Sequence, residues 1–231
     1  MISTPSAEPA QRYAVNSRPV RAYKFLDAHG RSPYTGTRWP SPGTWVEAAS
    51  VRQCHDGVHG CAAADLAWWL AVQLWEIELD GGIVESRHKV VARRGRLVRQ
   101  VDEYTAAVRA LGELSAWRCR DLAVPALRLA GHDGLAGQFA QCTTIEGLAA
   151  LRRTSFEAVD QSTVAGPAAT LAADAAFLLD RGAPSEAPFV ACCAAAHAAV
   201  GESGGRAEYD AAYAAERVFQ STWLTERLAL V

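Results

Sequence analysis

The sequence lacks the signatures of the common nucleotide-binding and protease classes. It has no phosphate-binding loop of the Gly-x-x-x-x-Gly-Lys type, no Gly-x-Gly-x-x-Gly after a predicted strand, and no His-Glu-x-x-His pair. The first residues lack the apolar run of a secretory signal, and no apolar stretch is long enough to cross a bilayer core of roughly 30 Å. We therefore expect a soluble protein that resides in the cytoplasm.

An excess of charge of one sign is absent as well. Lysine and arginine together number 23 against 25 for aspartate and glutamate, so the formal net charge is -2. A chain with this balance has no overall basic field to attract nucleic acid or an anionic membrane. We expect no membrane as a partner and find no strong signal for nucleic acid, although the run from Lys89 to Arg99 leaves a local basic patch open. The six cysteines are too few and too scattered for a disulfide scaffold, which agrees with a reducing compartment.

Three regions follow one another along the chain. Residues 1–20 are rich in Ser, Pro and Ala and predict a flexible leader. Residues 21–101 predict a β-rich module, whereas residues 102–231 are dominated by Ala and Leu, with breaks at ordinary helix spacing. The predicted fold class is α+β, a small mixed β-sheet module followed by an Ala-rich, all-helical region. Within the module we expect strands at 22–26, 44–48, 74–79, 88–92 and 96–101, and a helix at 62–72.

The densest cluster of reactive side chains is the run Cys54-His55-Asp56-Gly57-Val58-His59-Gly60-Cys61. Cys54, His59 and Cys61 are three soft ligands for zinc, and His88 or Cys119 would complete the shell. The spacing matches no standard pair of Cys-x-x-Cys hooks. A turn with half-buried thiols between a strand and a helix is therefore the favoured interpretation of this run, and a metal site is the weaker one.

Three further patterns suggest chemistry. Cys61 is a nucleophile candidate with His59 as its base, if the thiol lies at a helix N-terminus. The match to Gly-x-Ser-x-Gly at Ser203 follows an Ala-rich helix rather than a strand, and so predicts a connection between helices. Cys193 and His197 are one helical turn apart, but two ligands do not make a metal site, and a helix interface is favoured.

Tryptophans gather in the first half of the chain, and arginines follow them. The rings of Trp68 and Trp69, together with those of Trp39, Trp45 and Trp75, would line a pocket for a ring-bearing ligand or fill the core of a small sheet. A basic run extends from Lys89 to Arg99 without an acidic residue. Its Arg93 and Arg94 would either lie in a solvated turn or bind phosphate.

Residues 21–101 contain a series of motifs in a fixed order, which resembles that of an uncharacterised family of bacterial and phage proteins. Members of that family carry a Tyr-Lys strand, a Cys-x-x-Gly-x-His-x-Cys core and a following strand that contains Glu. The resemblance organises the sequence but implies no agreed function. The motifs are Ala22-Tyr23-Lys24-Phe25-Leu26, Ser32-Pro33-Tyr34-Thr35-Gly36, Trp39-Pro40, Cys54 with Gly57-Val58-His59-Gly60-Cys61, and Leu74-Trp75-Glu76-Ile77-Glu78-Leu79-Asp80-Gly81.

The order of Gly57-Val58-His59, Trp68-Trp69 and the run from Trp75 to Gly81 also resembles, more distantly, that of ADP-ribosyltransferase-like domains. This resemblance implies NAD as a ligand, with His59 stacked on the nicotinamide ring and residues around Lys24 facing the ribose. The family's catalytic Glu would fall near His88.

The sequence departs from that pattern at each catalytic position. Lys24 or Phe25 replaces a His of the first strand, His59 replaces a Tyr, and His88 stands where Glu is expected, with Glu85 as the nearest acid. A carboxylate there would stabilise the developing positive charge on the ribose, so its absence weakens the case for transfer from NAD. The RNA 2'-phosphotransferases, which resemble this fold, use Arg and His, which keeps a related phosphate chemistry open.

These features predict an enzyme-like pocket that binds a small molecule or a nucleotide. NAD and zinc are the two candidate cofactors. The catalytic candidates are His59, Lys24 and His88, and the cofactor-binding candidates are Trp68, Trp69, Arg93 and Arg94. The alternative is a non-catalytic binding or assembly protein that uses its helical half as a partner surface. A second copy could then bind through the last helix, where Ala212, Phe219, Trp223 and Leu230 share one face.

Overall fold

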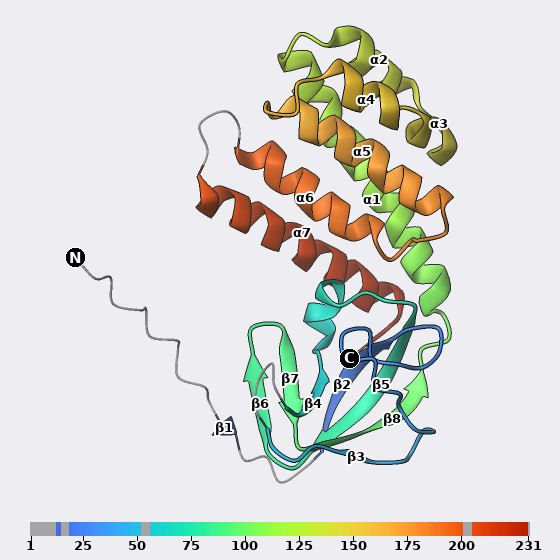
Figure 1. Ribbon diagram of the computed structural model, residues 1–231, viewed down its shortest axis with the longest axis vertical. Helices are drawn as coiled ribbons and strands as arrows, with labels where there is room; N and C mark the ends of the chain where they lie inside the picture. Colours follow the sequence, from blue (N-terminus) through green and yellow to red (C-terminus); the bar gives the residue numbers. More distant parts are fainter. Residues whose placement is uncertain (1–12, 15–18, 52–55, 201–204, 231) are drawn as a thin grey trace, which may run out of the picture. The chain divides into compact units, whose positions relative to one another are not determined.

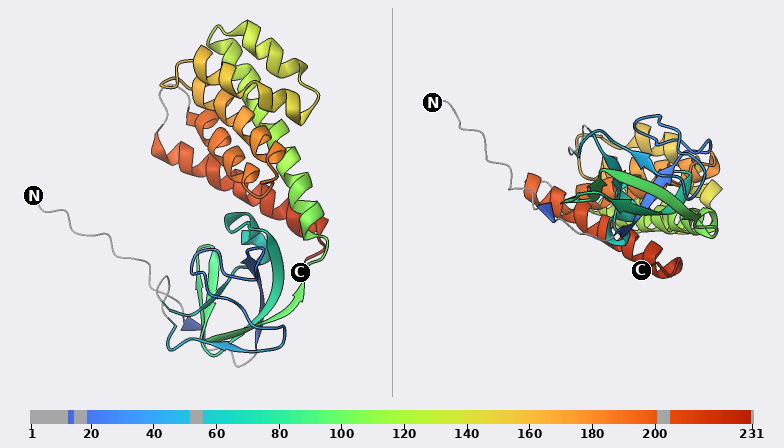
Figure 2. Two further views of the ribbon diagram at one scale, coloured as in Figure 1. Left: turned by 45° about the vertical axis from the view of Figure 1, so that its right-hand side comes forward. Right: turned by 90° about the horizontal axis from the view of Figure 1, so that it is seen from below.

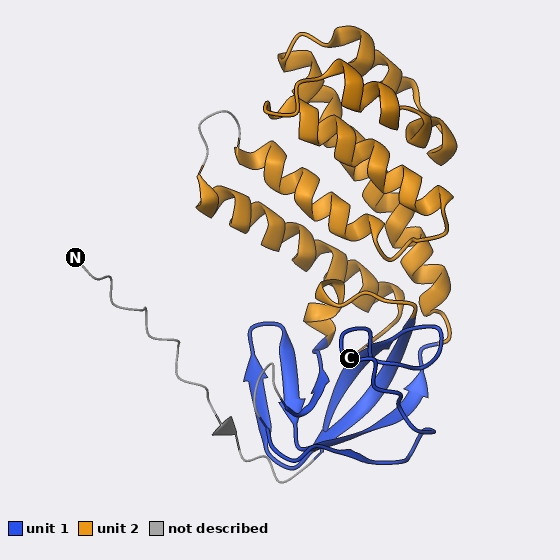
Figure 3. Ribbon diagram, in the orientation of Figure 1, with its two compact units in different colours: residues 1–62, 73–101 blue, residues 63–72, 102–231 orange. Residues whose placement is uncertain are grey.

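The computed structural model describes residues 13–14, 19–51, 56–200 and 205–230 (Figure 1). The chain forms two compact units, Met1–Ala62 with Gln73–Val101 and Ala63–Val72 with Asp102–Val231 (Figure 3). The predicted α+β class is confirmed, because antiparallel sheets in the first unit precede a helical region. Residues 63–72, which the sequence grouped with the β-rich module, belong to the helical unit. Most of the predicted leader lies outside the described residues.

The β-rich unit contains two four-stranded sheets. The first has the order β2 (Val20–Leu26), β5 (Gln73–Asp80), β8 (Arg94–Gln100) and β3 (Val46–Glu47), and the second has the order β1 (Tyr13–Ala14), β6 (Ile83–Ser86), β7 (Lys89–Ala92) and β4 (Val58–Gly60). Every strand pair in the described part of the chain is antiparallel, whereas the sequence predicted one small mixed sheet. A short turn such as the one between β6 and β7 joins two paired strands, and such a turn allows only antiparallel pairing.

The core of this unit follows from alternation along β2 and β5. Ala22 lies opposite Ile77 in the strand register, and both side chains are buried in the same cluster. Trp39 is buried there too, and its indole Nε1 donates a hydrogen bond of 2.9 Å to Ser32 Oγ. Successive side chains of a strand point to opposite faces, so the even-numbered residues of β2 face this cluster, whereas Tyr23 and Phe25 are buried on the other face of the strand.

Glycine explains why the run predicted as a turn contains the short strand β4. A Cβ atom on Gly60 would lie 2.8 Å from Ile77 Cδ1 and 3.0 Å from the Tyr23 carbonyl oxygen, so only glycine lets β4 come this close to β2 and β5. Gly95 on β8 has the same role, because a Cβ atom there would lie 2.7 Å from Val58 Cγ1. The two sheets therefore meet closely at β4.

The helical unit begins with the 3₁₀ helix η1 (Ala63–Trp68), where the sequence predicted a longer α-helix. Helices α1, α5, α6 and α7 lie side by side in the views of Figures 1 and 2. Small side chains permit this packing: a Cβ atom on Gly112 of α1 would lie 2.7 Å from Leu179 Cδ2. None of the helices in the described ranges is long and apolar enough to span a membrane. The α-helices are α1 (Tyr104–Leu129), α2 (Asp133–Gln141), α3 (Ile145–Ala150), α4 (Arg152–Ala158), α5 (Ala165–Asp180), α6 (Ala187–Val200) and α7 (Arg206–Arg227).

The buried face of α7 is polar, although the sequence predicted that an apolar stripe on this helix would pack. Glu216 accepts hydrogen bonds from the Arg118 guanidinium of α1, and Gln220 Nε2 donates one of 2.8 Å to the Pro188 carbonyl of α6. In the predicted stripe, Ala212, Phe219 and Trp223 are only partly buried, and Leu230 lies beyond the end of the helix. Hydrogen bonding rather than apolar content thus decides which face of α7 is buried.

Candidate functional site

A pair of backbone hydrogen bonds joins the strand that carries Lys24 to the segment that carries His59. The Tyr23 amide donates to the Cys61 carbonyl at 2.8 Å, and the Cys61 amide donates to the Tyr23 carbonyl at 2.9 Å. Lys24 follows Tyr23 directly, and His59 lies two residues before Cys61. Side chains that are 35 positions apart in the sequence are therefore brought into one neighbourhood of the β-rich unit.

Lys24 is a partly exposed lysine on the core-facing side of β2. It shares that side with the buried residues Ala22 and Leu26, and its Nζ lies 5.6 Å from the centre of the Trp39 ring. Burial lowers the pKa of Lys24 to about 8, while the nearby Cys61 thiol acts in the opposite direction. Among the described residues, no carboxylate lies within ion-pair distance of its ammonium group. Within the described ranges, Lys24 thus has no carboxylate as a structural counter-ion.

His59 is held between two buried residues but is itself only half-buried. Its neighbours Val58 and Gly60 face the core, so the imidazole projects from the opposite side of β4. Burial is the largest cause of the lowered pKa of His59, and the positive charges of Lys24 and Lys89 lower it further. A hydrogen bond with the Gly57 backbone and the charge of Asp56 oppose this shift only in part. The imidazole is therefore biased toward its neutral form.

The local sequence pattern did not assign Lys89 to this site, although the amino-acid composition distinguishes it as one of only two lysines. Lys24 and Lys89 are the two lysines of a chain with 23 lysine and arginine residues, and the charges of both act on His59. Arginine accounts for the remaining 21 of these residues. A lysine differs from arginine in having an amine that loses its proton readily when buried. Because lysine is rare in this chain, the two positions that carry it are candidates for a role that arginine cannot fill.

The other catalytic candidate, His88, lies in the turn between β6 and β7, one residue before Lys89. Trp68 and Trp69 belong to the helical unit rather than to the β-rich one. There the Trp68 ring lies 5.7 Å from that of Tyr213, and the guanidinium of Arg217 lies over both rings. The two tryptophans and the lysine–histidine group are thus parts of different units.

The basic run from Lys89 to Arg99 is largely neutralised by a row of acids across the sheet. On β8, Arg94, Arg96 and Arg99 pair with acids of β5, and the Arg94 and Arg96 guanidiniums also lie 4.7 and 4.8 Å from the centre of the Trp45 ring. Arg94 alternates with the buried Gly95 and so projects away from the face that carries Lys24. Arg93 is exposed at the β7–β8 connection. The acidic partners are Asp80, Glu78 and Glu76, in that order.

The predicted zinc ligands do not form a recognisable metal site in the described part of the chain. No three His, Cys, Asp or Glu side chains in those residues are placed to share an ion. Cys119 lies in α1 of the helical unit, where burial raises the pKa of its thiol well above the ordinary value. Cys54, the third member of the predicted set, and Ser203 of the Gly-x-Ser-x-Gly match lie outside the described residues.

Cys193 and His197 of α6 both contact Tyr209 of α7. The His197 and Tyr209 rings meet edge to face with centres 5.3 Å apart, and the Cys193 side chain is hydrogen-bonded with Tyr209. Burial raises the pKa of the Cys193 thiol. This arrangement fits the helix interface that the sequence favoured over metal binding.

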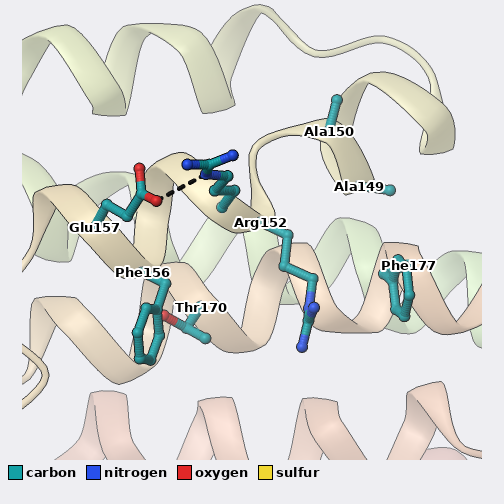
Figure 4. A pocket seen from close by; sticks show the side chains of 8 residues that line it. Ala149, Ala150, Arg152, Phe156, Glu157, Thr170 and Phe177 are labelled. Carbon is teal, nitrogen blue, oxygen red and sulfur yellow. Dashed lines mark hydrogen bonds and ion pairs between the residues drawn. The ribbon is translucent and has the colours of Figure 1, made fainter.

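The helical unit has a surface groove of about 560 Å³ between α3, α4 and α5 (Figure 4). Phe156, which is 64% exposed, and Thr170 line one part of it, and Phe177 lies farther along. Its arginines are already occupied: Arg153 pairs with Glu157, and Arg152 pairs with Asp174 of α5. Because its charges are neutralised internally, the groove offers no clear chemistry, and the lysine–histidine group of the β-rich unit is the stronger candidate site.

The fold defines this chain as an α+β protein, and Lys24, His59 and Lys89 are the candidate site residues of its β-rich unit. Comparison with protein-family models, with curated proteins and with solved structures gives no match.

Proposed function

We propose that the β-rich unit binds a small, phosphate-bearing ligand of the nucleotide or sugar-phosphate kind at a site formed by Lys24, His59 and Lys89. The single observation that carries this proposal is a half-buried histidine, His59, on which the charges of two lysines act, one of them the core-facing Lys24, which has no carboxylate in ion-pair distance within the described residues. The unit then acts as an enzyme-like module, and the cytoplasm, where phosphorylated metabolites occur, is the compartment that suits it.

Electrostatics favours an anion at this position. Lys24 and Lys89 both disfavour protonation of His59, so each lysine repels the imidazole when it is charged. A bound dianion would lie close to opposite charges in a partly desolvated setting, where such interactions are stronger than in water. The buried Trp39 ring next to the Lys24 ammonium contributes to this partly desolvated setting.

Phosphate binding is a better proposal than transfer of ADP-ribose from NAD. That transfer needs a carboxylate near the ribose, and the nearest acid in the sequence, Glu85, is exposed on β6. The imidazole of His88, at the place expected for the catalytic Glu, carries no negative charge and cannot replace a carboxylate. Transfer of ADP-ribose from NAD is therefore the more demanding proposal, because it needs a carboxylate near the ribose in addition to the anion site.

Calorimetric titration with pyrophosphate tests the proposal. We expect binding that weakens at least about tenfold in Lys24→Met and in Lys89→Met, because each removes one positive charge from the site. Arg38→Met is the matched control, since it makes the same charge change on an exposed side chain of the same unit. Equal affinity in Lys24→Met and Arg38→Met would refute the proposed site, and so would an absence of binding to the wild-type chain.

The alternative function is non-catalytic assembly, in which the helical unit provides a partner surface, including one for a second copy through α7. The exposed Val218, with 60% of its surface accessible, and the partly exposed Trp223 on the same helix favour it. Light scattering over a range of concentrations tests this function. A dimer that is lost in Val218→Asp supports it, whereas a monomer at every concentration excludes self-association through α7.

A further inference from the structure

We infer that the Lys24 amine condenses with a carbonyl group of the ligand, so that the substrate class is an aldehyde or a 2-oxo compound that also carries a phosphate or carboxylate. This inference rests on the proposed anion site, because the anionic group would hold the carbonyl near Lys24.

The position of Lys24 provides the geometric basis. Its stem lies on the core-facing side of β2 with Ala22 and Leu26, and its Nζ lies beside the face of the buried Trp39 ring. A lysine that is desolvated in an apolar setting is activated as an amine nucleophile for imine formation. Here burial desolvates the Lys24 amine, and the charge of Lys24 acts on the neighbouring His59.

The choice of lysine at this position also carries information. The chain uses arginine for nearly all its cations, and an arginine could bind a phosphate with two parallel hydrogen bonds, whereas a lysine offers only a point charge. An arginine, however, does not lose its proton in proteins and cannot attack a carbonyl. If anion binding were the whole function, arginine would serve at least as well, so the amine itself is the property that lysine adds.

The protonation state of Lys24 supports the same chemistry. With a pKa of about 8, roughly one tenth of Lys24 is neutral at pH 7, against about one part in a few thousand for an ordinary lysine. The neutral fraction is the nucleophile, so Lys24 should react with carbonyl compounds far faster than an exposed lysine does.

The step requires no oxidant or reductant. The amine lone pair of Lys24 forms a bond to the carbonyl carbon, the carbonyl π pair moves to oxygen, and one proton passes from nitrogen to that oxygen to give a carbinolamine. Loss of the hydroxyl with a proton releases one water and leaves the imine. His59, whose pKa is lowered, is available in its neutral form to carry these protons through bound water.

Pyridoxal 5'-phosphate is the first probe, because it combines an aldehyde with a phosphate. The full chain is incubated with it at pH 7.5, reduced with borohydride, digested and mapped by mass spectrometry. We expect the reduced adduct on Lys24 at least tenfold above that on Lys89, with protection by pyrophosphate. Lys24→Arg should lose the adduct while it keeps the positive charge and pyrophosphate binding, which also shows that the variant folds.

Three further probes separate the two proposals. Pyridoxal tests the need for the phosphate, glyoxylate tests a carboxylate in its place, and pyridoxine 5'-phosphate binds without an aldehyde. Binding of pyrophosphate and pyridoxine 5'-phosphate, with adducts only on Lys89 or the N-terminal amine, would overturn imine formation and leave the anion site intact. A Lys24 adduct formed equally well with pyridoxal, without competition by pyrophosphate, would instead overturn the anion site and keep the reactive amine.

Discussion

The Nζ of Lys24 lies 5.6 Å from the centre of the Trp39 ring, on the side of β2 that faces the core. A cation over an indole face gains on the order of 1 kcal/mol, which is less than the cost of withdrawing an ammonium from water. The lowered pKa shows that the cost prevails. A charged residue that is placed at a net cost, without a carboxylate partner in the described residues, is better explained by what it binds than by what it stabilises.

Replacement of Lys24 by methionine should therefore stabilise the β-rich unit at neutral pH. The folded-state pKa of about 8 is below that of an unfolded lysine, so burial of the charge costs stability in full below pH 8. The cost declines as the pH rises from about 8 to about 10.5, because the folded state then no longer carries the proton. Urea unfolding should show Lys24→Met more stable than wild type by roughly 1–3 kcal/mol at pH 7 and by little at pH 10.5. A destabilised Lys24→Met at pH 7 would indicate a structural role for the ammonium.

The titration of His59 should respond to both lysines. Because the positive charges of Lys24 and Lys89 add to the effect of burial in lowering its pKa, Lys24→Met should raise the pKa of His59, and Lys89→Met should raise it by less. Proton NMR of the imidazole ring measures both shifts, with Arg38→Met as the control. An unchanged His59 midpoint in Lys24→Met would show that the two groups are not neighbours in solution.

Gly60 should tolerate no side chain. An added Cβ atom would lie 2.8 Å from Ile77 Cδ1 and 3.0 Å from the Tyr23 carbonyl oxygen, so Gly60→Ala must separate β4 from β2. We expect a loss of roughly 1–3 kcal/mol in the free energy of unfolding, and weaker pyrophosphate binding as His59 moves away from Lys24. Gly134→Ala in α2, where nothing lies within 4 Å, is the control and should be neutral or slightly stabilising. Equal stability of the two variants would be inconsistent with the close approach of the sheets.

The buried ion pair of the helical unit should show strong coupling. Glu216 is buried, and its carboxylate accepts hydrogen bonds of 3.1 and 2.7 Å from the partly exposed Arg118 guanidinium. Arg118→Met leaves a buried carboxylate without its cation and should cost about 2–3 kcal/mol. The double variant Arg118→Met with Glu216→Gln should recover most of that loss, which a double-mutant cycle measures. Additive losses would mean that the pair is solvated.

The sequence predicted those elements whose residue types or alternation are typical of strands. The strands at 22–26 and 74–79 correspond to β2 and β5; the first is a short run of strand-forming residues, and in the second apolar residues recur at every second position. The strand β4 was missed because a three-residue strand with a glycine has no propensity signal, and its existence depends on contacts with Ile77 and Tyr23, which are distant in the sequence. The polar buried face of α7 was missed for a similar reason, because apolar periodicity cannot reveal that Glu216 and Gln220 have partners on other helices.

The candidate site was predictable only in part. Reactive residue types and the motif resemblance selected His59 and Lys24, but nothing in the local pattern assigns Lys89 to the same place. Sequence neighbours of the site were also misleading, because Trp68 and Trp69 follow Cys61 closely along the chain and yet belong to the helical unit. A count of lysines would have been a better guide than proximity.

The most direct test of the anion site at Lys24 is a titration of the two lysines by NMR, with lysine labelled at the Nζ and Cε atoms. Only two lysine signals are expected from this sequence, so the assignment needs one variant. The Lys24 signal should titrate near pH 8 in the free protein and at a higher pH with pyrophosphate bound, because an anion favours the charged amine. A Lys24 midpoint near the ordinary value of about 10.4 that does not move with pyrophosphate would contradict this account.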